Sequence, residues 1–200
     1  MAPEASIIAL QVCTPRQPGA FEATCTALRV ARGVDAAAKH RAQVLNVSLG
    51  GPPNRVLARL VQEVLTQGLI VVAASGNNGP AGPPLYPAAL AGVIAVAATD
   101  NRDQIYERSN LGAYVAVLAP GVDLMTTLPG GRYAFVTGTS FAAAHVSGVV
   151  ALLLDAAGSR PPEEIMGALK AGAVPSLLLS LGRVDVCRAL AHLGKPEACR

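Results

Sequence analysis

The order of apolar runs and amphipathic stretches along the chain predicts a layered α/β fold. Five continuous apolar runs have the length of a strand, at residues 6–12, 43–48, 69–74, 92–97 and 114–118. Such runs are typical of parallel strands that are buried on both faces. Stretches with helical periodicity lie between the first three, at residues 21–40 and 54–67. The pattern therefore predicts a mostly parallel sheet with right-handed crossovers and helices on both faces.

The second half of the chain adds three predicted helices. A strand-like lead-in at residues 133–136 precedes small residues and a long apolar run, which predict a helix to about residue 157. Another helix follows Pro161, with Glu163 and Glu164 in its first turn, where acidic side chains suit the helix dipole. Residues 183–193 predict a short strand and a last helix. We expect a single domain over residues 1–200, because this length builds one core and is short for two.

Composition narrows the classes of partner. The chain is 52% hydrophobic and 14% charged, which suits a core of Ala, Val and Leu. Its 16 basic and 13 acidic residues give a net charge of +3, and the basic residues are scattered, so we expect no nucleic-acid partner. No apolar run reaches the roughly 20 residues of a membrane span, so we expect no membrane partner. The N-terminus lacks the pattern of a signal peptide.

The four cysteines fall into two pairs that are far apart in the sequence. Two local disulfides, Cys13–Cys25 and Cys187–Cys199, would imply an oxidising compartment. The alternative is four small buried hydrophobic residues in a cytoplasmic protein. None of the cysteines has the spacing of a metal site or a redox pair, and no nucleotide-binding glycine motif opens a helix. We therefore expect no metal site and no cofactor.

Residues 136–148 place a serine where a strand turns into a helix. Ser140 follows Gly138 and Thr139 at the start of the predicted helix. A serine in that position exposes its hydroxyl, and its backbone N–H lies at the positive end of the helix, free to receive an anion. A nucleophilic hydroxyl needs this exposure and a donor for the oxyanion. On this segment alone, the better interpretation is an ordinary N-cap, with Thr139 or Ser140 satisfying the first-turn amides.

Four further segments change that interpretation. They read Val47-Ser-Leu-Gly50, Val-Val-Ala-Ala-Ser-Gly-Asn-Asn-Gly at residues 71–79, Tyr86-Pro87 followed by residues 93–96, and Ala119-Pro-Gly121. Together with residues 138–148, and in this order, they resemble the subtilisin-like serine peptidases (subtilases) over nearly the whole chain. The resemblance implies a three-layer α/β fold, hydrolysis of peptide bonds, and a candidate cis bond before Pro87.

The same resemblance assigns roles to individual residues. Ser140 is at the nucleophile position, and Asn77 is at the oxyanion-hole position, where its side-chain amide is partnered by the Ser140 backbone N–H. An extended peptide or protein substrate would pair with an exposed strand edge formed by Ser48, Leu49 and Gly50. The other wall of the pocket for a substrate side chain would be formed by Ala74, Ser75 and Gly76.

The chain departs from the family in what it lacks. The Asp-Ser/Thr-Gly and His-Gly-Thr-His motifs are absent from these residues. In the family, the Asp-bearing strand lies between the strands that residues 6–12 and 43–48 resemble. We therefore expect a sheet without the N-terminal strands and the His-bearing helix, in which the flanking strands close up or something else fills the space.

His145 lies too far along the helix to reach the Ser140 hydroxyl, and the resemblance implies a structural role for it. Ala144 stands where the family usually has a proline near the start of this helix.

Without a general base, Ser140 is an ordinary alcohol, so we expect the isolated chain not to be an effective peptidase. The favoured hypothesis is an N-terminally incomplete domain: a truncated form, a misassigned start, or half of a split enzyme. In each case the missing N-terminal segment or another chain would be its partner. The alternative is a degenerate pseudopeptidase that binds peptides. The family pattern and the disulfides would suit an extracellular or periplasmic protein.

Overall fold

A six-stranded, mostly parallel sheet forms the centre of the computed structural model, which describes residues 2–17, 23–176 and 181–199. The strand order is β3-β4-β5-β6-β10-β9, and only the β9–β10 pair is antiparallel. The strands are β3 (Val44–Val47), β4 (Ile70–Ala74), β5 (Ile94–Thr99), β6 (Val115–Pro120), β9 (Val174–Pro175) and β10 (Gly182–Arg183).

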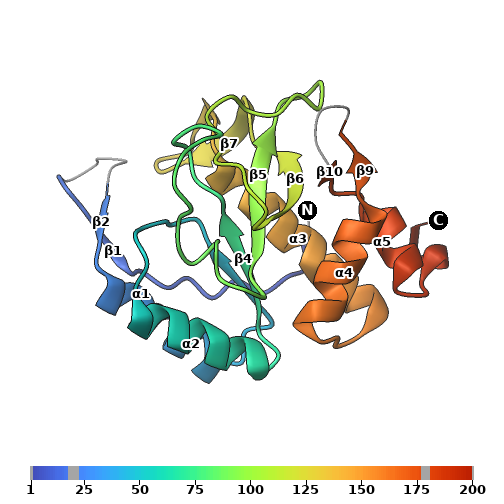
Figure 1. Cartoon of the computed structure of the whole chain (residues 1–200), viewed down its shortest axis with the longest axis horizontal. Helices are drawn as coiled ribbons and strands as arrows, with labels where there is room; N and C mark the ends of the chain where they lie inside the picture. Colours follow the sequence, from blue (N-terminus) through green and yellow to red (C-terminus); the bar gives the residue numbers. More distant parts are fainter. Residues whose placement is uncertain (1, 18–22, 177–180, 200) are drawn as a thin grey trace.

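Helices cover both faces of this sheet, as predicted (Figure 1). Alternate residues of β4 point to opposite faces. Ile70 and Val72 join the core that contains residues of α3, α4 and α5, whereas Val71 and Ala73 join the core that contains residues of α1 and α2. The helices are α1 (Ala27–Lys39), α2 (Arg55–Thr66), α3 (Thr139–Ala157), α4 (Pro162–Gly172) and α5 (Val186–His192), with a final 3₁₀ turn at Pro196–Cys199.

Side-chain caps fix where three of these helices begin. Thr26, Asn54 and Asp185 each accept a hydrogen bond from a backbone N–H in the first turn of α1, α2 and α5, respectively. These bonds satisfy donors that a helix start otherwise leaves without a partner. Gly68 follows the end of α2 with a φ of +89°, the left-handed conformation expected of a residue just past a helix.

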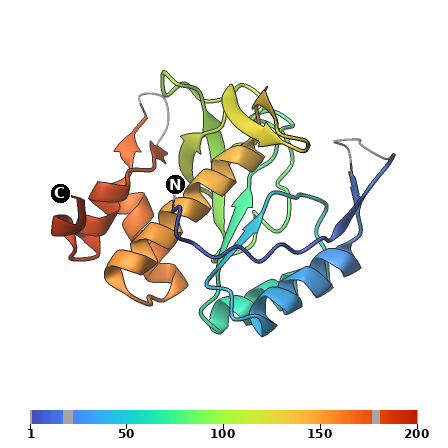
Figure 2. The same cartoon turned by 180° about the vertical axis from the view of Figure 1, so that it is seen from behind.

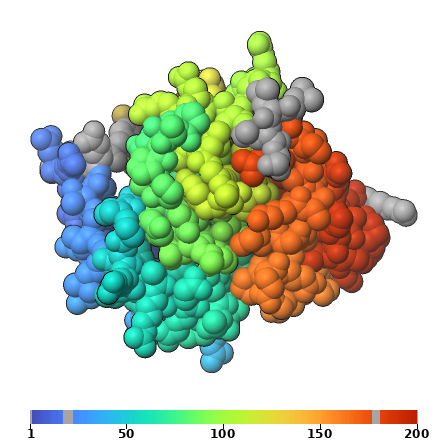
Figure 3. Space-filling model, in the orientation of Figure 1, coloured from blue at the N-terminus to red at the C-terminus, as the bar shows by residue number. Residues whose placement is uncertain are grey.

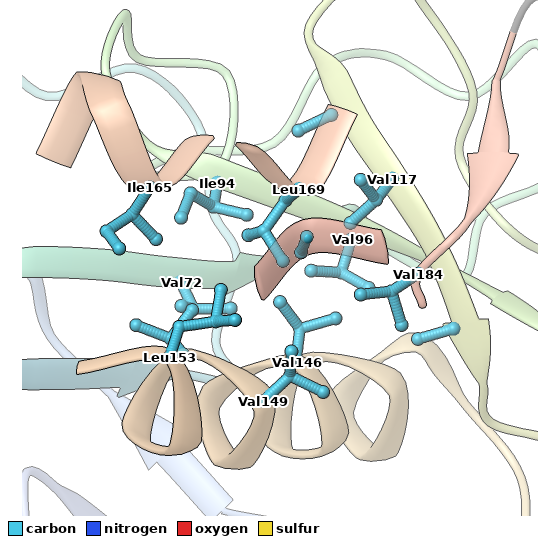
Figure 4. Packing of buried hydrophobic residues seen from close by; sticks show 14 of the residues in the cluster. Val72, Ile94, Val96, Val117, Val146, Val149, Leu153, Ile165, Leu169 and Val184 are labelled. Atoms are coloured by element: carbon cyan, nitrogen blue, oxygen red, sulfur yellow. The ribbon is translucent and has the colours of Figure 1, made fainter. Parts of the chain in front are cut away.

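The main core is built around α3. Its residues Val146, Val149 and Leu153 lie beneath Val72 of β4, with Leu169 of α4 on the opposite side of the cluster (Figure 4). By length and composition α3 could cross a membrane, and it is the one such helix among the described residues. Its apolar character is explained here by burial, since eight of its residues are buried against the sheet and its neighbours.

The prediction of a buried strand at residues 6–12 is wrong. This segment forms no strand, and Ile7 and Ile8 keep 89% and 44% of their surface exposed. A strand needs a neighbour to complete its hydrogen-bond ladder, and the outer edge of β3 is left without one in the described structure. The segments that flank the expected gap therefore do not close up.

The end of this segment is held by a close contact with α1. A Cβ atom on Gly33 would lie 2.5 Å from Val12 Cγ1, so a larger residue here would displace the Val12 side chain. Glycine inside a helix costs about 1 kcal/mol relative to alanine. The contact explains why α1 tolerates Gly33 in its interior.

A disulfide-linked hairpin precedes α1, where the sequence predicted that the helix would start at Phe21. Phe21 lies outside the described residues, and α1 begins at Ala27. The strands β1 (Cys13–Pro15) and β2 (Ala23–Cys25) pair antiparallel, with Cys13 directly opposite Cys25. The structure confirms both predicted disulfides: Cys13–Cys25 joins these strands and Cys187–Cys199 joins α5 to the final turn.

A second hairpin, of β7 (Leu124–Leu128) and β8 (Arg132–Val136), connects β6 to α3. Only β8 was anticipated from the sequence, as the strand-like lead-in to Ser140. Gly130 and Gly131, with φ of +79° and +70°, form the turn at its tip. The hairpin is a separate two-stranded sheet, and it lies at the N-terminal end of α3 (Figure 2).

We predict that Leu153→Ala will destabilise the fold strongly. Leu153 is fully buried in the core around α3, and truncating such a leucine costs about 2–5 kcal/mol of unfolding free energy. Leu28→Ala on α1 is the matched control, because 60% of its side chain is exposed. Urea denaturation of both variants checks this. Equal losses would contradict the assignment of the core.

Candidate active site

Ser140 is the second residue of α3 and is partly exposed. The turn before it is fixed to the end of β6, because the Gly138 N–H donates to the Gly121 carbonyl at 2.8 Å. A Cβ atom on Gly121 would lie 2.7 Å from Ala98 Cβ and 2.9 Å from the Gly138 carbonyl oxygen. Glycine is therefore required at the end of the Ala119-Pro-Gly motif for the nucleophile turn to approach the sheet.

The Asn77 side chain is held by the residue next to Ser140. Its Oδ1 accepts hydrogen bonds from the Thr139 backbone N–H at 3.0 Å and from Thr139 Oγ1 at 3.1 Å. The amide nitrogen Nδ2 of Asn77 donates no hydrogen bond within the described part of the chain. Because Asn77 Oδ1 accepts two hydrogen bonds, the plane of the side-chain amide is fixed. The amide N–H is thereby left free beside the first turn of α3, where the Ser140 backbone N–H also lacks an intrahelical acceptor.

Thr139 connects the end of β4 to the start of α3, and it is the functional residue that sequence reasoning missed. It is fully buried, and its Oγ1 also accepts from the Gly76 N–H at 3.2 Å. The N-cap interpretation of this segment is corrected: the N-cap is Gly138, without a side-chain cap bond. In the sequence, the only signal for this role of Thr139 was its position directly before Ser140.

A second network joins Ser140 to β3. Ser48 Oγ donates to the Ser140 carbonyl at 2.9 Å, and Asn46 Nδ2 donates to Ser48 Oγ at 3.1 Å. Asn46 Oδ1 in turn accepts a hydrogen bond from the Ser147 hydroxyl at 3.1 Å, about two turns after Ser140 on α3. The Ser48 side chain therefore faces the nucleophile turn, and its backbone remains the part that could pair with a peptide.

One glycine from each expected wall of the substrate groove lies against the side chain of Leu85. Added Cβ atoms on Gly50 and Gly76 would lie 2.9 Å and 2.7 Å, respectively, from Leu85 Cδ1. Leu49 is partly buried and Gly50 is exposed, whereas Ala74, Ser75 and Gly76 are buried. Sequence reasoning did not single out Leu85. The peptide bond before Pro87 is cis, as the resemblance implied.

Two further side chains hold the loop around Asn77. The buried Asn110 accepts from the Asn78 N–H at 2.7 Å and donates to the Pro83 carbonyl at 2.8 Å. Tyr114 donates its hydroxyl to the Ser75 carbonyl at 3.2 Å. Burial raises the pKa of Tyr114, partly offset by a hydrogen bond with Asn110, so the phenol remains a neutral donor at physiological pH.

No histidine contacts the Ser140 hydroxyl in the described part of the chain. None of His40, His145 and His192 forms a hydrogen bond with its hydroxyl; His40 and His192 are exposed at the ends of α1 and α5. His145 is half-buried on α3, where burial lowers its pKa and the positive charge of Arg183 acts in the same direction. In the same part of the chain, no three His, Cys, Asp or Glu residues are grouped to hold a metal ion. The arrangement therefore places a hydroxyl, on Ser140, beside two N–H groups, those of the Asn77 side chain and the Ser140 backbone.

We predict that Thr139→Val will lower stability by about 1–3 kcal/mol relative to Thr139→Ser. Valine removes the hydroxyl that accepts from Gly76 and donates to Asn77, leaving the buried Gly76 N–H without a partner, whereas serine keeps the hydroxyl. Urea denaturation measures the difference. If the valine and serine variants were equally stable, Thr139 would not hold the two segments together.

We predict a pH dependence that arises from His145. Its folded-state pKa is lowered from 6.5, so the unfolded chain binds a proton at this histidine at a higher pH than the folded chain does. The stability it contributes is complete above pH 6.5 and is lost as the pH falls towards the folded-state pKa. His145→Gln should therefore lose less stability than the wild type between about pH 7.5 and about pH 5.5, as measured by urea denaturation. An unchanged pH dependence would contradict this.

Comparisons with known proteins agree with this geometry. The Subtilase family (Peptidase S8) matches residues 1–187. M-protease of Shouchella clausii (strain KSM-K16) is 39% identical over 154 residues, which are 76% of this chain and 39% of that protein. Subtilisin Savinase of Lederbergia lenta is 38% identical over 154 residues, 76% of this chain and 55% of that protein. The chain thus spans between 39% and 55% of the length of these relatives.

Solved structures show the same likeness. The prenylagaramide maturation protease PagA superposes with a TM-score of 0.79 at 30% identity, covering 87% of this chain and 70% of that chain. The patellamide maturation protease PatA gives 0.78 at 34% identity, covering 85% and 70%. A cold-adapted subtilisin-like serine proteinase gives 0.74 at 30% identity, covering 81% and 60%. The family match and the shared fold establish that the chain belongs to the Subtilase family of peptidases.

Proposed function

We propose that the protein is a serine endopeptidase in which Ser140 is the nucleophile and Asn77 completes the oxyanion hole. One observation carries the proposal: Thr139 fixes Asn77 Oδ1 by two hydrogen bonds beside the first turn of α3, and the Asn77 amide N–H is left free. A preorganised donor of this kind stabilises the charge that develops when a hydroxyl attacks a carbonyl.

In the proposed reaction, Ser140 Oγ attacks the carbonyl carbon of the peptide bond and its proton passes to a general base. The carbonyl oxygen becomes an oxyanion, which accepts hydrogen bonds from Asn77 Nδ2 and the Ser140 backbone N–H. Collapse of the intermediate breaks the C–N bond, the amine leaves with a proton from the base, and an acyl-serine remains for water to hydrolyse. The substrate backbone would pair with the edge at Ser48, Leu49 and Gly50.

The base and the carboxylate that orients it are proposed to come from outside these 200 residues. The free edge of β3 supports this. Parallel strands end at the same edge of a sheet, so a strand added beside β3 would bring its carboxyl end to Ser48, whose hydroxyl contacts Ser140. The missing segment could belong to the same polypeptide or to another chain.

Peptides or proteins are the proposed substrates. The structural relatives PagA and PatA are described as maturation proteases, which supports this class of substrate. The two disulfides favour an oxidising compartment, such as the extracellular space or the periplasm.

A pseudopeptidase that binds peptides is the second candidate. The observation that favours it is that no histidine among the described residues contacts Ser140. The two candidates share the groove and differ in whether a base is ever supplied. The coding sequence on the 5′ side of the Met1 codon separates them. In-frame Asp-Ser/Thr-Gly and His-Gly-Thr-His motifs support the peptidase, and nearby stop codons support the pseudopeptidase.

We predict that the 200-residue protein alone will not be labelled rapidly by a fluorophosphonate probe, which reacts with activated serines. Without a base, the Ser140 hydroxyl is no better a nucleophile than an ordinary alcohol. Intact mass spectrometry follows the labelling. Addition of a polypeptide that carries the two motifs should produce stoichiometric labelling.

Ser140→Ala is the control, and it should abolish any labelling in both mixtures. Rapid stoichiometric labelling of the isolated wild-type chain at Ser140 would show that it contains its own base. Labelling that survives in Ser140→Ala would show that the nucleophile is elsewhere.

A further inference from the structure

Asn77 lies on a loop that contains no helix or strand. The loop follows β4 and comprises residues 76–83, which we call the Asn77 loop. Within the described part of the chain, the backbone N–H and C=O of Asn77 form no hydrogen bond. The position of its backbone therefore depends on the residues around it, whereas Thr139 holds only the end of its side chain.

Both chain neighbours of Asn77 are bonded to one residue, Asn110. The Asn110 backbone N–H donates to the Gly76 carbonyl at 2.9 Å, and Asn110 Oδ1 accepts from the Asn78 N–H at 2.7 Å. Asn110 Nδ2 donates to the Pro83 carbonyl at 2.8 Å. Asn110 thus binds the first and last residues of the Asn77 loop and the residues on either side of Asn77.

Two glycines allow the Asn110 side chain to enter the Asn77 loop. A Cβ atom on Gly76 would lie 2.9 Å from Asn110 Cγ, and one on Gly82 would lie 2.9 Å from Asn110 Nδ2. A larger residue at either position would therefore push against Asn110. The Asn110 side chain is fully buried, and both of its polar atoms have partners in the loop, as a buried amide requires.

Asn110 is itself held by the central sheet. The residue before it, Ser109, accepts a hydrogen bond at its Oγ from the Ala98 N–H of β5 at 3.1 Å. The Arg108 carbonyl accepts from the Gly79 N–H at 2.8 Å, which adds another bond to the loop. Because β5 is buried along its whole length, Asn110 is a fixed support for the loop.

We propose that Asn110 is a positioning residue for the oxyanion hole. By holding the peptide groups on both sides of Asn77, it keeps the Asn77 side chain where Thr139 binds its Oδ1 and where its amide N–H meets the oxyanion. In this role Asn110 does not touch the substrate and acts through Asn77. The inference rests on the proposed function, because an oxyanion forms only if Ser140 attacks a carbonyl.

Hydrogen exchange at the Thr139 backbone N–H tests the proposal in the 200-residue protein. This N–H donates to Asn77 Oδ1, so its exchange rate reports how firmly the Asn77 side chain is held. NMR spectroscopy of isotope-labelled protein measures the rate. We expect Asn110→Ala to raise the Thr139 exchange rate roughly tenfold, as the loss of one hydrogen bond implies.

A double variant shows whether Asn110 acts through Asn77. Asn77→Ala removes the acceptor itself and should raise the Thr139 exchange rate at least as much. Asn77→Ala with Asn110→Ala should then exchange no faster than Asn77→Ala alone, because residues that act through one contact are not additive. Additive effects would mean that Asn110 supports the fold in general, and they would overturn the proposal.

Ser109→Ala is the matched control. Ser109 is also fully buried and its substitution also removes one hydrogen bond, but that bond holds Ala98 of β5 and not the loop. It should leave the Thr139 exchange rate unchanged. If Asn110→Ala fails to fold, Gly82→Ala replaces it, since the added Cβ pushes on Asn110 Nδ2. A Thr139 rate that stays the same in the folded variant, or that rises equally in Ser109→Ala, overturns the proposal.

Labelling at Ser140 separates this inference from the proposed function. In the mixture with the polypeptide that carries the two motifs, Asn110→Ala should lower the maximal rate of fluorophosphonate labelling roughly tenfold. The probe concentration that gives half of that rate should not change, because the oxyanion donor acts after the probe has bound. If wild type and Asn110→Ala are labelled at the same rate, only this inference fails. If the wild type is not labelled at Ser140, the proposed function fails and the inference fails with it.

Discussion

The candidate active site depends on the hydroxyl group of Thr139. It accepts a hydrogen bond from the backbone that leaves β4 and donates to the Asn77 side chain, while the Thr139 backbone N–H binds the same side chain. Two segments that are far apart in the sequence are therefore fixed relative to each other by a buried polar cluster. Such clusters are stable only when their members are satisfied, so the orientation of Asn77 is coupled to the start of α3. The buried residues of α3, which pack in the main core, keep the start of that helix in place.

Much of the fold could be predicted from the sequence, because parallel strands and amphipathic helices have strong periodic signals. The strands at Val44–Val47 and Ile70–Ala74 lie within the predicted ranges. The prediction of a strand at residues 6–12 was wrong for a physical reason. An apolar run shows that burial is favourable, but it does not show that a neighbouring strand exists. In the site, Ser140 and Asn77 could be placed by resemblance. Thr139 could not, because a buried threonine bridge depends on contacts between distant segments.

The elements that hold Ser140 and Asn77 in place differ from β3 in how well they are packed and paired. The Ser140 turn and the Asn77 side chain are held by β4, β6 and α3, whose residues pack together in the main core. In the orientation of Figure 1, the green chain that follows β4 and β5 covers the middle of the visible face, beside the orange helix α4 (Figure 3). β3, by contrast, pairs with β4 alone among the described residues. The geometry around Ser140 and Asn77 is therefore set by elements that are paired and buried within the described structure.

The Cys13–Cys25 bond gives the β1–β2 hairpin a property that its short strands alone would not provide. It closes a loop of the chain ahead of α1, with the close contact between Val12 and Gly33 just outside it. A single backbone cut within this loop would leave both pieces covalently joined and each end of the loop still attached to the body of the protein. A protease that nicks this loop would therefore release the N-terminal segment only after the disulfide is reduced.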